Sequence, residues 1–307
     1  GMLPRGADAV VMVEHTRPLD STTVEVCKPV APGGNVLGPT DDAAAGQVLL
    51  EAGQRLRPQD LGLLAALGVV ELDVIRRPRA GILSTGDEVI PIDQVPQPGQ
   101  VRDVNAHTLT AQVFAAGGDP VALGLVPDDA EQLRAAVTDG LKRCDLLLLS
   151  GGSSMGTRDL TAEIFLSFEG ARMLVHGVSV APGKPFIWAR AGSHHLLGLP
   201  GQVTSCMISF HLFAEPILER MLGREAHPFT RFGERAAVLT RNLPSVPGRQ
   251  EYVRVKLVRD DGRWLAEPLF GKSGVIRTLT QGHGLIRVDT HSEGLDEGTP
   301  VTVLLYP

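Results

Sequence analysis

Runs of apolar residues alternate with amphipathic stretches through the middle of the chain. The runs at 80–84, 121–125 and 145–149 are short and largely apolar, which is typical of parallel strands buried on both faces. Between and after them, apolar residues recur at helical spacing, and this predicts helices at 106–116, 128–142, 160–168 and 204–222. We expect Pro216 to kink the last helix. The alternation predicts an α/β domain with a central parallel sheet and helices on both faces.

The two ends of the chain have other patterns. Near the N-terminus, 10–13 and 23–26 are short strand candidates, and a helix begins near Pro58 and ends at Gly68. Near the C-terminus, apolar and polar residues alternate, which predicts a small all-β domain, either a barrel or a sandwich. We therefore expect three parts: a mainly β region with one helix, the α/β domain and the all-β domain, at 1–77, 78–224 and 228–307.

Composition and charge exclude several classes of protein. The 307 residues carry a net charge of −6 without a block of Lys and Arg, so the electrostatic footprint of a nucleic-acid-binding protein is absent. The apolar runs are far shorter than a membrane span, and the first residues do not form a signal peptide. Cys27, Cys144 and Cys206 are far apart and form no CxxC pair. We expect a protein of the reducing cytoplasm, without nucleic-acid or membrane partners, disulfide framework or zinc site.

Glycine-rich segments follow three of the strand-like runs. They are Ser84-Thr85-Gly86-Asp87-Glu88, Ser150-Gly151-Gly152-Ser153-Ser154-Met155-Gly156 and Gly198-Leu199-Pro200-Gly201. Glycine lets a backbone turn sharply and bring its N–H groups close to an anion. Open α/β sheets bind ligands at the carboxyl ends of their strands. The three segments therefore predict a site for a phosphate-bearing ligand.

Acidic residues accompany these segments. Carboxylates repel phosphate unless a cation lies between them, so we interpret Asp87 and Glu88 as ligands of Mg²⁺, which commonly takes one or two carboxylates, waters and phosphate oxygens. The alternative is a turn with a solvated acidic end. Asp128 and Asp159 stand near predicted helix starts, where the helix dipole alone would favour an acid.

Several polar and basic residues are candidates for anion binding. Lys184 is held in Pro182-Gly183-Lys184-Pro185, where restricted backbone freedom suits a point-charge contact to an oxyanion. Ser205 is either an anion contact or a hydroxyl in the first turn of its helix. We expect Asn105 to cap the helix that follows it. Arg249 and Arg254 are either anion contacts or exposed charges of the β domain.

These motifs, in this order, resemble the molybdopterin molybdenumtransferases, the family of bacterial MoeA and the gephyrin E domain. The resemblance covers nearly the whole chain, and its specificity comes from the order and spacing of motifs that are individually weak. Besides the three glycine-rich segments and the Lys184 turn, it rests on Leu3-Pro4-Arg5-Gly6-Ala7-Asp8, Asp103-Val104-Asn105, Leu125-Val126-Pro127-Asp128-Asp129, Asp159 and Arg249-Gln250-Glu251-Tyr252-Val253-Arg254.

The resemblance implies a fold and a reaction. The fold is a central α/β domain of the molybdopterin-binding type, preceded by a partial, mainly β region and followed by a small β-barrel domain. The family takes adenylylated molybdopterin and molybdate, releases AMP and places the metal on the dithiolene. It uses Mg²⁺ and acts as a cytoplasmic homodimer, with the molybdopterin adenylyltransferase or a recipient molybdoenzyme as further possible partners.

The resemblance also implies roles for single residues. The expected catalytic acids are Asp87, Glu88, Asp128 and Asp159, of which Asp87 and Glu88 hold the metal. The expected cofactor-binding residues are Thr85, Gly86, Asn105, Ser150, Gly151, Gly152, Ser153, Ser154, Gly156, Pro182, Gly183, Lys184, Gly198, Pro200, Gly201, Ser205, Arg249 and Arg254.

The sequence departs from the family pattern at four places. It lacks the family's longer N-terminal stretch, which contains a Ser-Ala-Met-Asp-Gly-Tyr-type segment. Ala181 stands where the family usually has a lysine, which predicts weaker molybdate binding. Gln202-Val203 stands where the family usually has an Asn-Pro pair, and Leu37 stands where it usually has an arginine. Both changes could alter which metal and which form of the pterin the protein accepts.

Two other functions stay open at this point. A non-catalytic molybdopterin-binding scaffold would bind the pterin and hand the cofactor to a partner enzyme without turnover. A molybdopterin adenylyltransferase would use the shared central fold and consume ATP, although the flanking domains argue against it.

Overall fold

The computed structural model describes residues 1–151 and 157–307, the last of these ranges without the side chains of 157–159. The chain divides into two compact units, Gly1–Val74 and Ile75–Pro307, which we describe separately. Among the described residues, no helix combines the length and the apolar character that crossing a membrane requires.

The first unit contains little regular structure. A 3-10 helix, η1 (Val13–His15), precedes a small antiparallel pair formed by β1 (Thr16–Pro18) and β2 (Val24–Val26). The predicted strand at 23–26 is confirmed, whereas the one at 10–13 is wrong, because the chain there runs into η1. Helix α1 (Pro58–Ala66) begins with the predicted proline in its first turn, and Gly68 follows its end with a φ of +74°.

The second unit is built around a six-stranded sheet. Its order is β6 (Asp119–Val126), β3 (Arg79–Thr85), β7 (Leu146–Gly151), β11 (His194–Leu199), β10 (Ile187–Ala191) and β8 (Arg172–His176). The first four strands are parallel, as predicted. Strands β10 and β8 were not predicted, and β10 runs antiparallel to both of its neighbours, β11 and β8. A tight turn at Gly192, with a φ of +58°, joins β10 to β11 without the crossover helix that a parallel strand requires.

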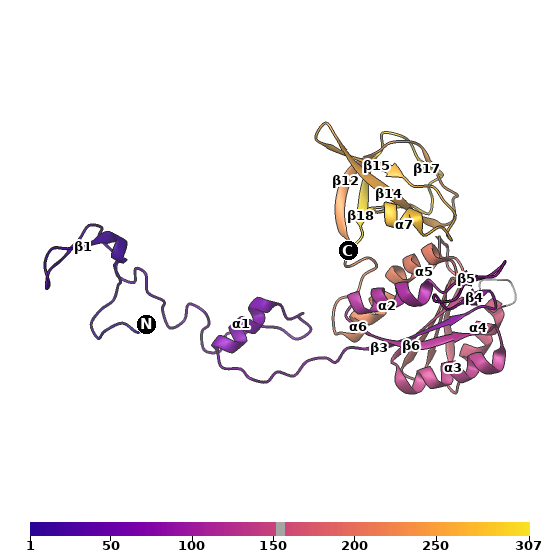
Figure 1. Ribbon diagram of the computed structural model, residues 1–307, viewed down its shortest axis with the longest axis horizontal. Coiled ribbons are helices and arrows are strands. Elements are labelled where there is room, and N and C mark those ends of the chain that lie inside the picture. The colour runs from indigo at the N-terminus through magenta and orange to yellow at the C-terminus, as the bar shows by residue number, and fades with distance from the viewer. Residues whose placement is uncertain (152–156) are drawn as a thin grey trace. The chain divides into compact units, whose positions relative to one another are not determined.

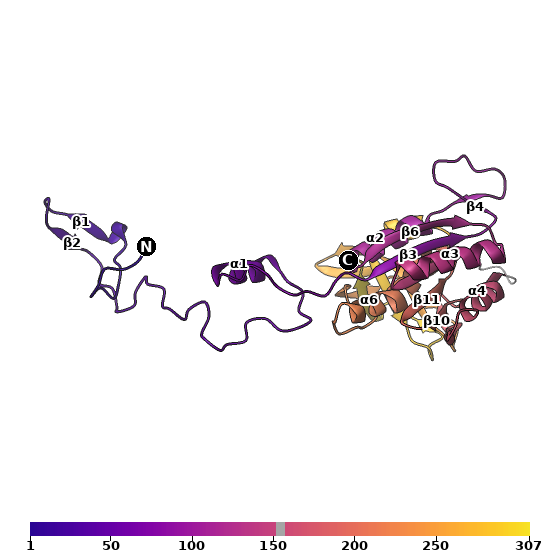
Figure 2. The same ribbon diagram turned by 90° about the horizontal axis from the view of Figure 1, so that it is seen from below.

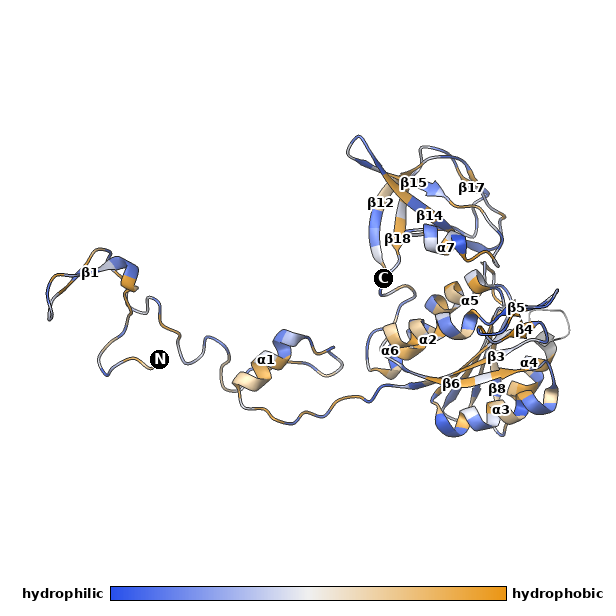
Figure 3. Ribbon diagram, in the orientation of Figure 1, coloured by the Kyte–Doolittle hydropathy of each residue, from blue (hydrophilic) through white to orange (hydrophobic). Residues whose placement is uncertain are grey.

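Helices cover both faces of this sheet, as predicted (Figure 1). Alternate residues of β7 serve the two faces, because Leu146 and Leu148 belong to one apolar cluster and Leu147 and Leu149 to another. The first face packs against α2 (Asn105–Ala115) and the helices after β11, and the second against α3 (Ala130–Arg143) and α4 (Thr157–Leu166). Figure 3 shows β3 and β6 mainly in hydrophobic colours and much of α3 in hydrophilic ones.

The last helical segment of the α/β domain is interrupted. It consists of α5 (Val203–Ser209), a π-helical turn η2 (Phe210–Ala214) and α6 (Glu215–Met221). The N–H of Glu215 donates to the carbonyl of Phe210, five residues back. Pro216 has no N–H for the normal helical bond, and its ring would crowd the preceding turn. A widened turn therefore lies immediately before Pro216, where the sequence predicts a kink.

A closed barrel follows. Its five strands are β12 (Gly233–Leu239), β14 (Gln250–Asp260), β15 (Arg263–Pro268), β16 (Gly284–Val288) and β18 (Pro300–Leu305), and it closes because β15 pairs with both β12 and β14. This settles the choice between barrel and sandwich. The short pair β13 (Leu243–Pro244) and β17 (Gly294–Leu295) and the helix α7 (Arg277–Gln281) complete it.

Two short pairings matter for the site. Strand β9 (Val180–Ala181), from the α/β domain, joins the barrel by running parallel to the start of β14. Strands β4 (Val89–Ile90) and β5 (Val101–Arg102) pair just after the first glycine-rich segment. Figure 2 shows the loop between them extending away from the sheet.

Candidate functional site

Strand register brings the three glycine-rich segments to one edge of the sheet. Ser150 at the end of β7 is paired with Ser84 on one side and with Leu199 on the other. The hydroxyl oxygens of Ser84 and Ser150 lie 3.2 Å apart and both side chains are buried. Because all these strands are parallel, their carboxyl ends meet here, as the sequence predicts.

A cavity of about 390 Å³ opens at this edge, and we call it the sheet-edge cavity. Residues from all three segments line it together with the start of α2. The predicted site residues among them are Thr85, Glu88, Asn105, Ser150, Gly151 and Gly201. Other residues that we did not predict also line the cavity. Arg102 and Asp103 come from the stretch after β4, Gln202 and Val203 from the start of α5, and Gly274 from the barrel.

Asn105 joins two parts of the cavity wall. Its amide Nδ2 donates to the carbonyl of Gly201 at 2.8 Å, which ties the turn after β11 to the start of α2. The prediction that Asn105 caps α2 is wrong. Asp103 takes that role, since its carboxylate accepts the N–H of Ala106 at 3.0 Å, while Asn105 is already the first helical residue.

Two acidic side chains lie together beside the cavity. The N–H of Asp128 donates to Oδ1 of Asp87 at 3.1 Å, and the hydroxyl of Thr85 donates to Oδ1 of Asp128 at 2.7 Å. No cluster of three or more His, Cys, Asp or Glu residues suited to a metal occurs in the described part of the chain. Magnesium, however, is usually held by one or two carboxylates plus water and phosphate oxygens. One or two carboxylates from among Asp87, Glu88 and Asp128 fit that chemistry.

Gly151 is required by the close approach of two strand ends. Its φ is +128°, and a Cβ atom at this position would collide with the carbonyl oxygen of Thr85. Any side chain would therefore separate β7 from β3 where the first two segments meet. The glycine thus serves the packing of the strand ends, in addition to any contact that its N–H makes with a ligand.

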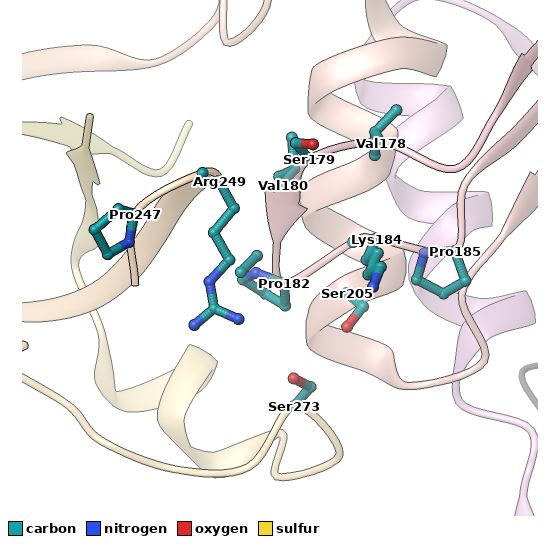
Figure 4. A pocket seen from close by; sticks show the side chains of 13 residues that line it. Val178, Ser179, Val180, Pro182, Lys184, Pro185, Ser205, Pro247, Arg249 and Ser273 are labelled. Carbon is teal, nitrogen blue, oxygen red and sulfur yellow. The ribbon is translucent and has the colours of Figure 1, made fainter. Parts of the chain in front are cut away.

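A second cavity, of about 370 Å³, lies between the α/β domain and the barrel, and we call it the interdomain cavity. It is lined by the turn after β9, by α5 and by two loops of the barrel. The predicted residues Pro182, Gly183, Lys184, Ser205 and Arg249 all line it. Figure 4 shows the Arg249 guanidinium extending into the space between Ser273 and Ser205, with Lys184 beside Ser205.

The interdomain cavity carries positive charge. Lys184 and Arg249 come from different domains, and Ala181 lines the wall at the position before the Pro182-Gly183-Lys184 turn. Arg249 is only loosely paired, since its Nη2 lies 3.5 Å from the carboxylate of Glu251. Its buried Nε has no hydrogen-bond partner among the described residues. Two cations and the hydroxyls of Ser205 and Ser273 form a set suited to an oxyanion.

Arg254 is buried, with 7% of its surface exposed, so its interpretation as an exposed barrel charge is wrong. Its Nη2 donates to the carbonyl of Gly271 at 2.8 Å, and burial lowers the pKa of its guanidinium. It lines a neighbouring cavity of about 330 Å³ that shares Arg249 and Ser273 with the interdomain cavity. The loop at 269–274 folds over this side of β14, so alternation along the strand did not predict exposure correctly.

Some predicted residues are placed elsewhere. Gly198 and Pro200 are buried in and after β11, where a Cβ on Gly198 would press on Ile187, and neither lines the two cavities. Gly86 makes the turn after β3 with a φ of +146°. Gly152, Ser153, Ser154 and Gly156 lie outside the described residues, as does the side chain of Asp159. Leu37 belongs to the first unit.

Ser273 was not predicted from the sequence, although it lines both the interdomain cavity and its neighbour. It lies in the loop between β15 and α7, where no strand or helix pattern points to the site. The Lys272-Ser273-Gly274 triplet is the one local signal, a small polar turn beside a lysine.

A cavity at the carboxyl edge of a mostly parallel α/β sheet, adjoining a cationic cavity completed by a closed barrel, is typical of an α/β protein with a site suited to a small-molecule ligand. Comparisons with known proteins narrow this class. Residues 81–220 match the family described as "Probable molybdopterin binding domain", residues 1–68 the "MoeA N-terminal region (domain I and II)" and residues 236–306 the "MoeA C-terminal region (domain IV)".

Individual relatives agree with these matches. The molybdopterin molybdenumtransferase of Bacillus subtilis is 33% identical over 99% of this chain and 70% of its own length. The molybdopterin molybdenumtransferase of Haemophilus influenzae is 30% identical over 82% of this chain. The match covers 62% of the length of the Haemophilus protein. A solved MoeA structure from Pyrococcus horikoshii superposes with a TM-score of 0.81 at 33% identity, covering 99% of this chain and 73% of the other.

The chain therefore belongs to the MoeA family of molybdopterin molybdenumtransferases, enzymes of molybdenum cofactor biosynthesis. This confirms the resemblance drawn from the motifs, together with the α/β fold and the C-terminal barrel.

Proposed function

We propose that this protein inserts molybdate into adenylylated molybdopterin and releases AMP. The observation that carries the proposal is the adjacency of two complementary cavities. The sheet-edge cavity offers glycine turns, hydroxyls and carboxylates to a pterin nucleotide, and the interdomain cavity offers Lys184 and Arg249 to an oxyanion. Residues 202–205 at the start of α5 contribute to both, since Gln202 and Val203 line the first and Ser205 lines the second.

The acidic pair supports cleavage of the phosphoanhydride. One or two carboxylates from among Asp87, Glu88 and Asp128 would hold a magnesium ion, which when bound supplies positive charge that offsets the charge developing on phosphate oxygens. The hydroxyl of Thr85 fixes the carboxylate of Asp128, and the N–H of Asp128 fixes that of Asp87. These bonds orient the carboxylates before any ligand arrives, and such preorganisation lowers the cost of reaching the transition state.

The cationic residues support capture of molybdate. Lys184 is a compact point charge on a turn bounded by prolines, while Arg249 and Ser273 approach from the barrel. Ser205 supplies a hydroxyl from α5. We extend the proposal to a cytoplasmic homodimer that receives its pterin from a molybdopterin adenylyltransferase and delivers cofactor to molybdoenzymes.

Incubation with adenylylated molybdopterin, molybdate and Mg²⁺ tests the proposal, with AMP release and pterin-bound metal as the two readouts. We expect both products, and their amounts should fall together when Asp87→Asn and Asp128→Asn are introduced. Binding of the pterin without AMP release would identify a scaffold instead. Consumption of ATP with free molybdopterin would identify an adenylyltransferase.

A further inference from the structure

The interdomain cavity depends on the joint between the α/β domain and the barrel, because each supplies part of its wall. Three kinds of contact form this joint. Strand β9 pairs with β14, and the N–H of Thr204 in α5 donates to the carbonyl of Ser273 at 3.0 Å. Apolar side chains from both domains form one buried cluster around Phe229, Tyr252 and Leu285. Any change in this joint would move Arg249 and Ser273 relative to Lys184 and Ser205.

His211 lies at the centre of the joint, in the π-helical turn η2. Its ring is buried, with 7% of the residue exposed. The Phe232 ring meets it edge-on at a centroid distance of 4.8 Å, and Phe229 lies 6.1 Å away. Phe229 in turn lies 5.0 Å from Tyr252 of β14. The imidazole is thus a polar group within an aromatic cluster that reaches the barrel, and π-helical turns are frequent at functional sites.

The hydrogen bonds of this ring indicate which of its two nitrogens donates. Nε2 of Gln112 lies 3.2 Å from the carbonyl of Met207 and 2.9 Å from Nε2 of His211. The amide nitrogen can only donate, so Nε2 of His211 must accept. The proton then resides on Nδ1, which donates to Oε2 of Glu215 at 2.7 Å. The bonds therefore run in one direction, from α2 through η2 to α6.

Glu215 faces the start of the barrel through an ion pair and not through a hydrogen bond, since its Oε1 has no hydrogen-bond partner among the described residues. Its side chain is fully buried, and its other oxygen lies 3.6 Å from the guanidinium of Arg231. A buried carboxylate is costly unless it is paired, so the pair holds Arg231 in place. Arg231 stands two residues before β12, where the chain enters the barrel. The charge on Glu215 in α6 thus links the entry to the barrel with the interrupted helical segment α5–η2–α6, whose first helix, α5, carries Ser205.

We propose that His211 and Glu215 are positioning residues that set the orientation of the barrel on the α/β domain and so assemble the oxyanion site of the interdomain cavity. This inference rests on the proposed function only in taking molybdate as the occupant of that cavity. The sheet-edge cavity is lined almost wholly by the α/β domain, so it should be much less sensitive to the same joint.

Two substitutions in the full chain test this inference. His211→Phe keeps the aromatic packing and removes both hydrogen bonds, whereas His211→Asn keeps a donor near the Nδ1 position. We expect His211→Phe to raise the molybdate dissociation constant about tenfold in calorimetry, as small misplacements of binding groups commonly do. His211→Asn should recover most of the affinity. Molybdopterin binding should change by less than about twofold, since it uses the other cavity.

Two further variants separate positioning from general destabilisation. Glu215→Gln keeps an acceptor for His211 but removes the charge that holds Arg231, so it should also weaken molybdate binding. The matched control is Glu219→Gln, which removes a buried carboxylate of the same helix that pairs with Arg224 at 2.9 Å. It should lower stability and leave molybdate affinity unchanged. Equal losses for Glu215→Gln and Glu219→Gln would overturn the inference.

A distance measurement makes the test independent of activity. Spin labels at Ala135→Cys on α3 and Lys256→Cys on β14, both exposed positions, would be placed in a Cys27→Ser background. We expect the interlabel distance to shift or broaden in His211→Phe and Glu215→Gln but not in Glu219→Gln. An unchanged distance in both variants overturns the inference even where the parent chain binds molybdate. A parent chain that binds no molybdate refutes the proposed function, while the distances still test the positioning.

Discussion

The two cavities differ in what holds them together. The sheet-edge cavity is assembled by the register of four parallel strands, and its wall residues stand next to buried strand ends. The interdomain cavity is assembled by a joint between domains, with Lys184 and Arg249 far apart in sequence. The first is therefore fixed as soon as the sheet forms, whereas the second depends on how the barrel docks. Damage to the sheet edge should cost stability, and damage to the joint should cost oxyanion affinity first.

The two cavities also differ in the charge of the residues that line them. Glu88 and Asp103 line the sheet-edge cavity with Arg102 as its cation, while Lys184 and Arg249 line the interdomain cavity. Under the proposed function, a pterin nucleotide and an oxyanion, which repel each other, would occupy adjoining cavities of different charge. Substitutions that affect only one cavity can test this division.

The largest expected effect is that of Gly151→Ala. The added methyl group would collide with the Thr85 carbonyl in a backbone conformation that L residues rarely adopt. We expect a loss of about 3 kcal/mol or more in unfolding free energy, measured by urea denaturation. Gly170→Ala is the control, since Gly170 also has a positive φ, of +67°, but open space around it. It should cost only about 1 kcal/mol, and equal losses would refute the packing argument.

The second effect concerns the interdomain cavity. Lys184→Ala should weaken molybdate binding about tenfold or more, because it removes one of two cations that face the cavity. Unfolding free energy should hardly change, since the side chain is exposed. Calorimetric titration of molybdate measures the loss, and Lys256→Ala on the exposed face of β14 serves as the control. Similar losses for both lysines would show that net charge, and not this cavity, attracts the anion.

The sheet edge could be predicted from the sequence and the joint could not. Parallel strands end in a common edge, so three glycine-rich segments following apolar runs were enough to predict the convergence of Ser84, Ser150 and Gly201. Ser273 and Arg254 show the limit of this reasoning. Their positions depend on how a loop folds across β14, and nothing in the local periodicity of either segment encodes that long-range packing.

Local sequence patterns also gave wrong predictions where another residue was better placed to make the expected interaction. Asn105 has a residue type suited to capping, but Asp103 reaches the free N–H of Ala106 and leaves the amide to bond Gly201. Pro216 predicted an irregularity in its helix, and the structure has a π-helical turn, η2, immediately before the α6 helix that contains Pro216. In both cases the residue type predicted a local hydrogen bond or a break in the helix, and tertiary contacts decided which atoms took part.

A substitution that should increase molybdate affinity also tests the interdomain cavity. Ala181 stands on its wall, so Ala181→Lys would add a third cation near the oxyanion. Even a quarter of the roughly 4 kcal/mol expected for two charges at about 4 Å in an effective dielectric near 20 would tighten molybdate binding about fivefold. Calorimetry with molybdate measures the gain. Unchanged affinity would show that a lysine at this position does not reach the anion.

The smallest expected effect lies at the opposite end of the sheet. Asp145, immediately before β7, accepts from the guanidinium of Arg76 at 2.6 Å and from the N–H of Arg79 at 2.8 Å. The hydrogen bond from Arg76 is the main cause that lowers the pKa of Asp145 below its ordinary value of 3.8. A pKa that is lower in the folded state stabilises the protein above the unfolded value, and this stabilisation is lost as the pH falls through the folded value.

Asp145→Asn should therefore lower the unfolding free energy at neutral pH by about 1 kcal/mol, given the partial exposure of the pair. The difference from the parent chain should shrink as the pH falls below about 4. Denaturation at several pH values measures it, with Asp139→Asn as the control because its pair with Arg143 is exposed on both sides. Molybdate affinity should not change, since Asp145 stands at the amino end of β7 and both cavities lie elsewhere. A loss of stability that is independent of pH, or any loss of molybdate affinity, would contradict the separation of stability and binding between the two ends of the sheet.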